Sequence, residues 1–314
     1  IMMGEPNSTF SEILMKFFLS KKFKVIKKKI VLIGSQNLFL QQMKKLNYKI
    51  PLNEISDIKY SKNKKINIIN VEYKFKKIFN KISNKSNEYI KNCFDKSLKI
   101  IKQNKSICFI NGPVSKKHFL KKKYPGITEY ISNRTNSNNE VMLIYNERLS
   151  VSPITTHLPI KHVNKNINKK KIINNISKIN NFFKFKLKKK PKFAVLGLNP
   201  HCETTDKISE EKYKIIPAIN YLRKKNLSIE GPFSADTFFS NKNVKKFDVV
   251  IGMYHDQVLT PIKTLFNFNA INLTIGLPFI RISPDHGPNH EMIGKNKSDA
   301  SSIFYAIKFL NRIS

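Results

Sequence analysis

Short runs of β-branched and other apolar residues alternate along this chain with stretches whose apolar residues recur at helical spacing. This alternation is typical of an α/β fold with a mainly parallel sheet. At 314 residues, of which 40% are hydrophobic, the chain fits one large domain or two modest interlocked ones. The predicted strands are Lys29–Ile33, Ile107–Ile110, Val141–Ile144, Leu149–Ile154, Phe193–Leu196 and Val249–Met253. Helices are predicted from Ile90 to Ile101, from Ile172 to Phe183, from Ser209 through Leu222 and from Ser298 through Leu310.

Three of the seven histidines come shortly after predicted strands: His157 in ITTHLP, His201 in LGLNPHCE and His255 in GMYHDQ. Ligands in open α/β sheets bind beyond the carboxyl ends of the strands, so three imidazoles delivered there can converge on one point. Three neutral imidazoles suit Zn²⁺ or a similar divalent ion and leave a position open for a substrate oxygen. A lone histidine more often satisfies a core or loop hydrogen bond, and no local metal motif is present. The metal prediction therefore rests on the three shared strand-end positions.

Two carboxylates are expected near the same strand ends. Asp256 directly follows His255, and Asp236 lies in GPFSADTFF. Either can orient an imidazole or accept a proton from a substrate hydroxyl, the roles that such a site requires. A helix cap before Thr237 is an equally good interpretation of Asp236.

Anion-binding side chains are expected farther along the chain. Lys263, Asn272 and Arg281 follow one another at intervals of nine residues. An arginine fork matches two oxygens and a lysine supplies a point charge, so this set is a reasonable cradle for phosphate and carboxylate. The segment NGPVSKK at 111–117 can also place main-chain amides and Lys116 near an anion, although a Gly-Pro turn is the simpler interpretation.

Several familiar sites are excluded by what the sequence lacks. It contains no G-x-G-x-x-G, no G-x-x-x-x-G-K-[ST] and no G-x-S-x-G, so a nicotinamide cofactor would be held without a Rossmann fingerprint. Its three cysteines, Cys93, Cys108 and Cys202, are too few and too scattered for a disulfide framework, which points to a reducing compartment. No apolar run approaches the roughly 18 residues that span a bilayer, and the first residues lack the layout of a secretory signal. We expect a cytoplasmic protein without membrane contact.

The chain is strongly basic, with 58 Lys and Arg against 21 Asp and Glu and a net charge of +37. The lysines occur with many Asn and Ile residues and are spread along most of the chain, a pattern typical of a biased genome rather than of a binding patch. No nucleic-acid-binding module and no Trp are present. We therefore expect a solvated basic surface and no specific nucleic-acid partner, with nucleic-acid binding kept as an alternative.

Nine short segments, taken in order, resemble the 4-hydroxythreonine-4-phosphate dehydrogenase family of vitamin B6 (pyridoxal phosphate) biosynthesis. The last two of them are highly specific to that family. The segments are GEPNS at 4–8, NGPVSKK at 111–117, GITEYI at 126–131, TTHLPI at 155–160, LGLNPH at 196–201, SEE at 209–211, GPFSADTFF at 231–239, MYHDQVL at 253–259 and NLTIGLPFIRISPDHG at 272–287.

The resemblance implies an isocitrate/isopropylmalate dehydrogenase-like fold, with two interlocked α/β/α lobes and a central cleft. We expect one lobe, on the cofactor side, to comprise residues 1–115 and 276–314. Residues 116–275 would form the other lobe, which would carry the metal and substrate sites and the dimer contacts. A homodimer with its active sites at the subunit interface is also implied.

The resemblance assigns site residues one by one. The metal-binding histidines of the family correspond to His157, His201 and His255, and its substrate-contacting residues correspond to Thr128, Lys263, Asn272 and Arg281. The segment 285–299 resembles an adenosine-side cofactor loop and predicts His286 and Gly287 as cofactor-binding residues. Two departures stand out: Ile127 replaces the family histidine before Thr128, and CETTDKISEE replaces a Gly-rich run after His201.

The implied reaction is oxidation of the secondary hydroxyl of 4-phosphooxy-L-threonine by NAD⁺ or NADP⁺, assisted by Zn, Mg or Co. Loss of CO₂ then gives 3-amino-2-oxopropyl phosphate. Asp256 or Asp236 is the expected proton acceptor. The alternatives are a sister dehydrogenase acting on 4-phospho-threonate or 4-phospho-erythronate, which Ile127 favours, a non-catalytic binding module of the same family, and the nucleic-acid binder.

Overall fold

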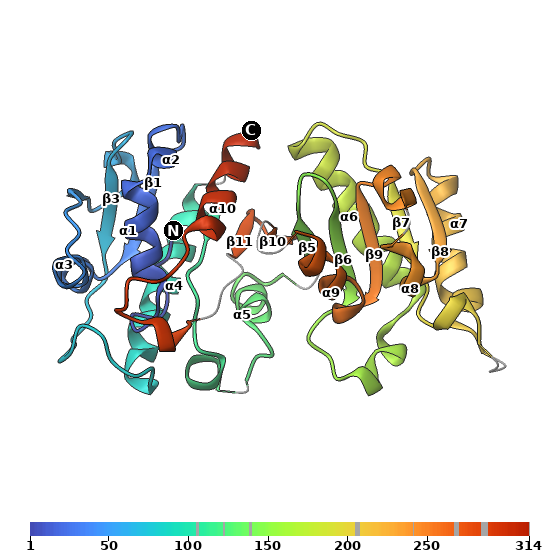
Figure 1. The fold of residues 1–314 in the computed structure, drawn as a ribbon, viewed down its shortest axis with the longest axis horizontal. Helices are drawn as coiled ribbons and strands as arrows, with labels where there is room; N and C mark the ends of the chain where they lie inside the picture. The colour runs from blue at the N-terminus through green and yellow to red at the C-terminus, as the bar shows by residue number, and fades with distance from the viewer. Residues whose placement is uncertain are drawn as a thin grey trace. The chain divides into compact units, whose positions relative to one another are not determined.

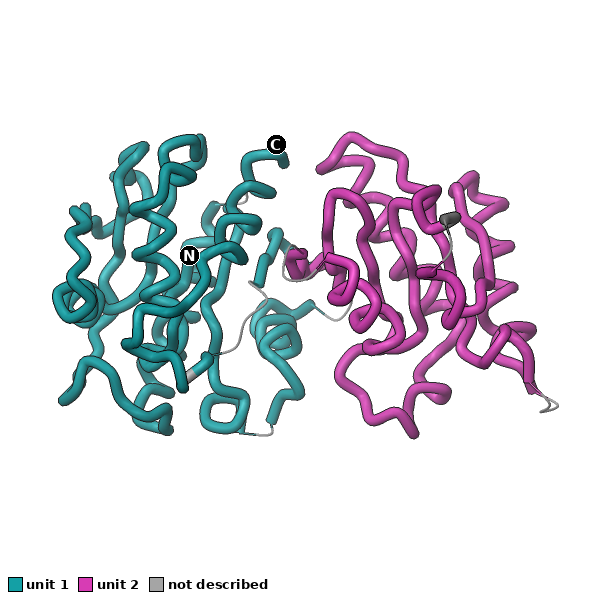
Figure 2. Tube along the Cα trace, in the orientation of Figure 1, with its two compact units in different colours: residues 1–138, 277–314 teal, residues 139–276 magenta. Residues whose placement is uncertain are grey.

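The computed structural model describes residues 1–104, 107–121, 123–137, 140–204, 208–240, 242–266, 270–283 and 288–313. The chain forms two compact units, Ile1–Asn138 with Leu277–Ser314 and Asn139–Gly276 (Figures 1 and 2). Each unit is an α/β structure. None of the helices in the described ranges has both the length and the apolar composition needed to span a bilayer.

The first unit contains a three-stranded parallel sheet in the order β1-β3-β2, and β4 pairs in parallel with β11. Met2 bridges both groups, because it pairs in parallel with Ile33 of β1 and with Asn111 next to β4. The strands are β1 (Ile30–Gly34), β2 (Leu52–Glu54), β3 (Ile66–Asn70), β4 (Phe109–Ile110) and β11 (Arg281–Ser283). The helices are α1 (Phe10–Leu19), α2 (Lys21–Lys24), α3 (Gln36–Lys45), α4 (Asn87–Gln103), α5 (Ile127–Arg134) and α10 (Ser301–Arg312).

The first boundary between the units differs from the predicted one. The sequence predicts it after residue 115, whereas the structure places it after residue 138. Residues of α5 pack into the same core as α4: Tyr130 stacks edge-on against Phe94, with ring centroids 5.0 Å apart, and Ile131 is fully buried there. This packing joins segments far apart in the chain, so no local pattern signals it. The second boundary, predicted after residue 275, lies after residue 276.

The second unit is built on six strands in the order β10-β5-β6-β9-β7-β8. The run β6-β9-β7-β8 is parallel, and β5 is antiparallel to both of its neighbours. The strands are β5 (Val141–Tyr145), β6 (Ser150–Thr155), β7 (Phe193–Leu196), β8 (Ile229–Phe233), β9 (Val249–Tyr254) and β10 (Ile271–Ile275). The helices are α6 (Lys169–Lys186), α7 (Ile216–Lys224), α8 (Ala235–Phe238) and α9 (His255–Phe266).

The central strands of this sheet are covered on both faces. Every residue of β7 is buried, which is the pattern of a strand between two layers of helices. Ala194 and Leu196 share a core with Val258 of α9, which packs over β6 and β9, while α6 and α7 pack against each other behind the sheet (Figure 1). This layering leaves the carboxyl ends of the parallel strands as the place where polar side chains can gather.

Candidate active site

The three histidines singled out in the sequence follow three neighbouring parallel strands. His157 comes two residues after β6, His255 directly after β9, and His201 a few residues after β7. Because the sheet order is β6-β9-β7, all three side chains belong to one edge of one sheet, as predicted. The rings of His157 and His255 lie with their centroids 6.1 Å apart.

His201 is placed differently from the other two. It lies in a short 3₁₀ turn with a φ of 56°, and its side chain is 75% exposed. Its Nδ1 is 4.0 Å from Oδ2 of Asp236. Across the described ranges, no three His, Cys, Asp or Glu side chains gather closely enough to hold a metal ion. The structure thus brings two imidazoles together and leaves the third beside a carboxylate.

Each of the two candidate carboxylates lies near one of the predicted histidines, Asp256 near His255 and Asp236 near His201. Oδ1 of Asp256 lies 2.7 Å from Nδ1 of His255, so this carboxylate orients that ring. Asp236 lies in the first turn of α8, where its Oδ1 accepts hydrogen bonds from Ser234 Oγ and from the Thr237 main-chain nitrogen. The bond from Ser234 is the main cause that lowers the pKa of Asp236, and the nearby His201 acts in the same direction. Asp236 therefore combines the helix-end role with a position near an imidazole.

The predicted Lys263–Asn272–Arg281 set is divided between the two units. Lys263 lies on the exposed side of α9, and Asn272 is half-buried on β10, where it pairs with Ile144. Arg281 opens β11 of the first unit. The equal spacing in sequence therefore corresponds to three different elements.

Arg281 is a buried cation held by two neutral side chains. Its Nε donates to Asn111 Oδ1 at 2.8 Å and its Nη1 donates to Thr128 Oγ1 at 2.8 Å. Burial lowers the pKa of Arg281 to about 10, while the charge of Glu129 acts in the opposite direction. Thr128, predicted as a substrate contact, is thus a partner of Arg281. Asn111 was not predicted, although it opens the NGPVSKK segment that sequence patterns had marked.

That segment also borders a cavity of 940 Å³ within the first unit. Ser115, Lys116 and Lys117 line it together with Ile127 and Ser283. Hydroxyl groups and lysines facing a cavity suit an anionic ligand. The predicted cofactor residues His286 and Gly287 lie outside the described residues, between Ser283 and Pro288, which both line this cavity.

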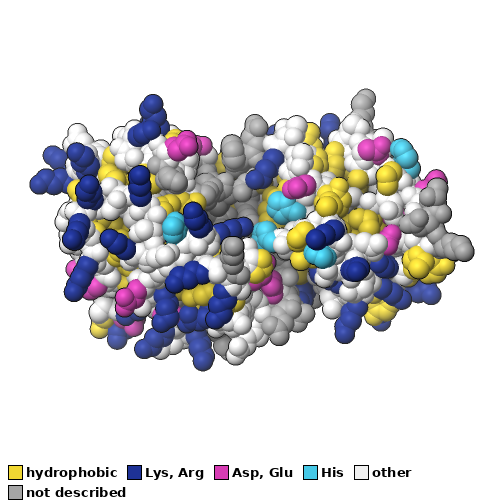
Figure 3. All heavy atoms as spheres, turned by 90° about the horizontal axis from the view of Figure 1, so that it is seen from below, with side chains coloured by type: hydrophobic (Ala, Val, Ile, Leu, Met, Phe, Trp, Pro, Cys, Tyr) yellow, Lys and Arg dark blue, Asp and Glu magenta, His cyan; other side chains and the backbone are white. Residues whose placement is uncertain are grey.

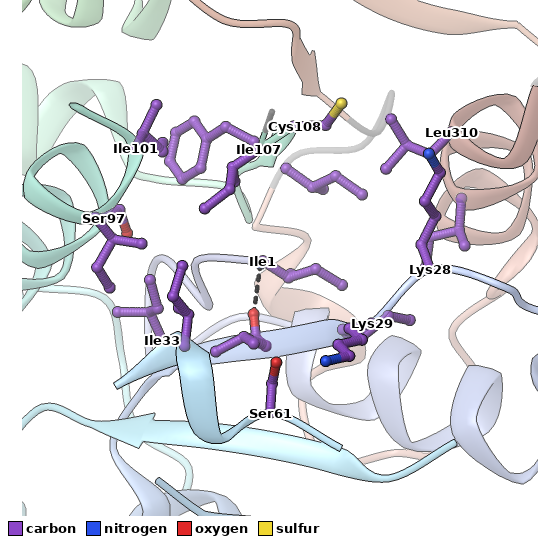
Figure 4. A pocket seen from close by; sticks show the side chains of 17 residues that line it. Ile1, Lys28, Lys29, Ile33, Ser61, Ser97, Ile101, Ile107, Cys108 and Leu310 are labelled. Atoms are coloured by element: carbon purple, nitrogen blue, oxygen red, sulfur yellow. Dashed lines mark hydrogen bonds between the residues drawn. The ribbon is translucent and has the colours of Figure 1, made fainter. Parts of the chain in front are cut away.

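A second cavity of the first unit, of 200 Å³, has a different character (Figure 4). Its lining is mostly aliphatic and includes Ile33, Ile101, Ile107 and Leu310, and the main-chain nitrogen of Ile1 donates to the Val31 oxygen at its wall. None of the predicted site residues lines it. An apolar lining of this kind does not suit a phosphorylated substrate.

Figure 3 shows Lys and Arg side chains distributed over both units on the face that it presents, interspersed with other side chains. A solvated basic surface without a specific nucleic-acid partner stays a prediction.

Known proteins resemble this chain in both sequence and structure. Residues 26–310 match the family model described as pyridoxal phosphate biosynthetic protein PdxA. The chain is 36% identical, over 98% of its length and 95% of that protein, to a 4-hydroxythreonine-4-phosphate dehydrogenase of Sulfurihydrogenibium sp.. The crystal structure of a 4-hydroxythreonine-4-phosphate dehydrogenase from Klebsiella pneumoniae superposes with a TM-score of 0.83 at 25% identity, covering 99% of this chain and 98% of that one.

A more distant likeness bears on the fold. The isocitrate dehydrogenase of Methylococcus capsulatus matches with a TM-score of 0.52 at 10% identity, over 99% of this chain and 84% of that one. The predicted isocitrate dehydrogenase-like α/β fold is confirmed.

Proposed function

Because the chain belongs to the PdxA family of pyridoxal phosphate biosynthetic proteins, we propose that it oxidises and decarboxylates 4-phosphooxy-L-threonine with a nicotinamide cofactor. The protein is an oxidoreductase of the 4-hydroxythreonine-4-phosphate dehydrogenase type. Its reaction yields 3-amino-2-oxopropyl phosphate, CO₂ and reduced NAD or NADP. The observation that carries the mechanism is the pairing of His157 with His255 beyond two adjacent parallel strands.

The imidazoles of this pair suit Zn²⁺ or Co²⁺, whereas Mg²⁺ would take most of its ligands from water or carboxylate oxygens. Asp256 engages Nδ1 of His255, which leaves Nε2 of that ring as the ligand atom, the usual arrangement around metal-binding imidazoles. His157 supplies a second ring 6.1 Å away, and His201 is the proposed third ligand. Such a cation, when bound, lowers the pKa of a coordinated hydroxyl and polarises a carbonyl.

The other residues bind the substrate and move its protons. In this proposal Asp256 or Asp236 accepts the proton of the secondary hydroxyl while the hydride passes to the nicotinamide. Arg281 and Lys263 bind anionic groups of the substrate, and Asn272 and Thr128 add polar contacts. Loss of CO₂ from the resulting β-keto acid leaves the electron pair of the broken C–C bond on the carbon between the departing carboxylate and the ketone. This carbon is then protonated.

We propose the 940 Å³ cavity of the first unit for the anionic part of the cofactor. Three of its lining residues, Lys81, Lys116 and Lys117, are cationic, and Ser115 offers a hydroxyl. The phosphates of NAD⁺ or NADP⁺ require such donors when no Rossmann glycine turn is present. The predicted cofactor-binding roles of His286 and Gly287 remain part of the proposal.

A homodimer is also part of the proposal. Exposed apolar side chains occur on two stretches of the second unit, Leu158 and Ile160 after β6 and Tyr213 and Ile216 near the start of α7. The second stretch is joined to the segment that follows the first, since Lys214 Nζ donates to the side-chain oxygen of Asn164, four residues after Ile160, at 2.9 Å. Clustered exposed apolar residues are typical of an interface between subunits, and sedimentation velocity measures the state directly.

A sister activity on phosphorylated sugar acids is favoured by one observation, the position of Ile127. This residue lines the anion-suited cavity where the family has a histidine, so a polar contact is missing. We expect kcat/KM for 4-phosphooxy-L-threonine to exceed that for 4-phospho-threonate and 4-phospho-erythronate by at least about tenfold, because the relative that matches 98% of this chain is named for that substrate. The rates of nicotinamide reduction with the three substrates test this, and a reversed preference would assign the chain to the sister activity.

A further inference from the structure

The loop that leads from β7 to His201 is held by the buried carboxylate of Glu211, which lies 13 residues after Leu198 in the chain. Glu211 is 2% exposed, and its Oε1 accepts hydrogen bonds from the main-chain nitrogens of Leu198 at 2.7 Å and Asn199 at 2.9 Å. Its Oε2 accepts from Asn199 Nδ2 at 2.9 Å and from Ser209 Oγ at 3.1 Å. Burial alone would raise the pKa of Glu211, yet these hydrogen bonds keep it below its ordinary value. The side chain is therefore a charged acceptor for successive amides of the loop.

A second side chain holds the same loop from helix α9, which follows the neighbouring strand β9. Gln257 of α9 donates from Nε2 to the Gly197 oxygen at 2.8 Å, and its Oε1 accepts from the Met253 main-chain nitrogen at 2.7 Å. This amide thereby connects the end of β7 to the end of β9, two residues before His255. Main-chain groups of Gly197, Leu198 and Asn199 are thus all bonded to side chains.

The closeness of this packing is visible at Gly197. A Cβ added there would lie 2.6 Å from Cys202 Sγ and 3.2 Å from Glu211 Oε1. Only glycine therefore leaves room for both side chains over the loop. Both the carboxylate and the thiol pack directly on the turn that follows β7.

The loop needs such support because of the backbone beyond it. His201 and Cys202 both have left-handed backbones, with φ of 56° and 63°. For residues other than glycine this conformation is disfavoured, and it persists only where the surroundings impose it. Glu211 and Gln257 supply contacts that can impose it.

We propose that Glu211, assisted by Gln257, is a positioning residue that fixes the loop 197–199 and so aims His201 toward a divalent cation. This inference rests on the proposed function, in which His201 is the third cation ligand. It goes beyond that function because it assigns Glu211 a role in positioning His201, in addition to the favourable charge that an acidic residue adds near a helix N-terminus.

The test replaces Glu211 with Gln and uses Glu210→Gln as its matched control. The neighbouring carboxylate is also buried, but among the loop residues it bonds only to Asn199 Nδ2, at 3.0 Å. Amide hydrogen exchange at Leu198 and Asn199 is measured first, and we expect it to accelerate at least about tenfold in Glu211→Gln and to change little in the control. Unchanged exchange at both amides would overturn the inference.

Cation binding is measured next, by titration of the full-length protein with Co²⁺ and Zn²⁺. We expect Glu211→Gln to weaken binding about 10- to 100-fold, the usual cost of losing a residue that supports a ligand. Gln257→Met provides the same test if Glu211→Gln does not fold, since it removes both bonds of the second support while keeping the side-chain length.

His201→Ala separates failure of the inference from failure of the proposed function. If His201→Ala weakens cation binding and the double variant with Glu211→Gln is no weaker than His201→Ala alone, the two residues act through one path, as the inference requires. If His201→Ala weakens binding while Glu211→Gln leaves it unchanged, the positioning role is wrong. If His201→Ala has no effect, the third-ligand assignment in the proposed function fails, and the role toward the cation fails with it.

Discussion

Replacement of His255 with alanine is expected to lower kcat by about 10³-fold or more. This ring pairs with His157 and is oriented by Asp256, so its loss removes a central cation ligand and, with it, several kcal/mol of stabilisation of the developing charge. The fold should survive, because the side chain is only half-buried at a strand end. Steady-state rates of nicotinamide reduction, together with thermal unfolding, measure both effects.

His162→Ala is the matched control for this variant. His162 is an exposed histidine of the same unit, on the 3₁₀ turn Ile160–His162. Its replacement should leave kcat within about twofold. Retention of full activity by His255→Ala, with unchanged cation content, would contradict the assignment.

Replacement of Arg281 with methionine is expected to raise KM for the phosphorylated substrate about 10- to 100-fold. One charge-assisted hydrogen bond to an anion contributes roughly 1.5–3 kcal/mol, which corresponds to that range. Burial lowers the pKa of Arg281 only to about 10, so the group keeps its charge at neutral pH. Arg281 is buried beside Asn111 and Thr128, and a guanidinium in this position can bind an anionic group of the substrate.

Stability should respond in a different way from KM. Methionine removes the desolvation cost of the buried charge but leaves Oδ1 of the buried Asn111 without its donor, so the free energy of unfolding is expected to fall by about 1–3 kcal/mol. The pKa of Arg281 lies below its unfolded value, so the unfolded state binds more protons between about pH 10 and 12.5 and stability rises across that window. At pH 7 to 9 this group adds no pH dependence to the wild-type protein.

Arg134→Met is the control for Arg281→Met. Arg134 lies in the same unit and bonds to Tyr130 and Asp95, with its side chain 33% exposed. Its loss should leave KM unchanged. An unchanged KM in Arg281→Met as well would remove Arg281 from the substrate site.

The sequence located those parts of the fold whose signal is local. Phe193–Leu196 is a strand as predicted, and Val249–Met253 differs from β9 by one residue, because dense β-branched and apolar runs have few alternatives. β3, with the sequence INIIN, was missed within a stretch rich in Lys and Asn, and β8 was missed because it contains Gly231 and Pro232. These strands are recognised only when their neighbours in the sheet are known.

Part of the candidate site could likewise be predicted from local sequence, and part depends on contacts between distant residues. The strand-end positions of His157 and His255 follow from periodicity, and their proximity follows from sheet order. The roles of Asn111, Gln257 and Glu211 depend on contacts such as Gln257 with Gly197, which are 60 residues apart in the chain. The sequence indicates Glu211 only as an acidic residue near a helix start, and a helix-end role does not require its side chain to reach the loop before His201.

The most direct test of the central claim measures absorbance of the reduced nicotinamide with purified protein, 4-phosphooxy-L-threonine and NAD⁺ or NADP⁺. The protein is assayed with an added divalent metal, after chelation, and after the metal is restored. We expect reduction that stops on chelation and returns with the metal, and the faster of the two cofactors identifies the preference. Reduction that persists unchanged in the chelated protein would contradict the cation site at His157 and His255, and absence of reduction with this substrate under every condition would contradict the proposed reaction.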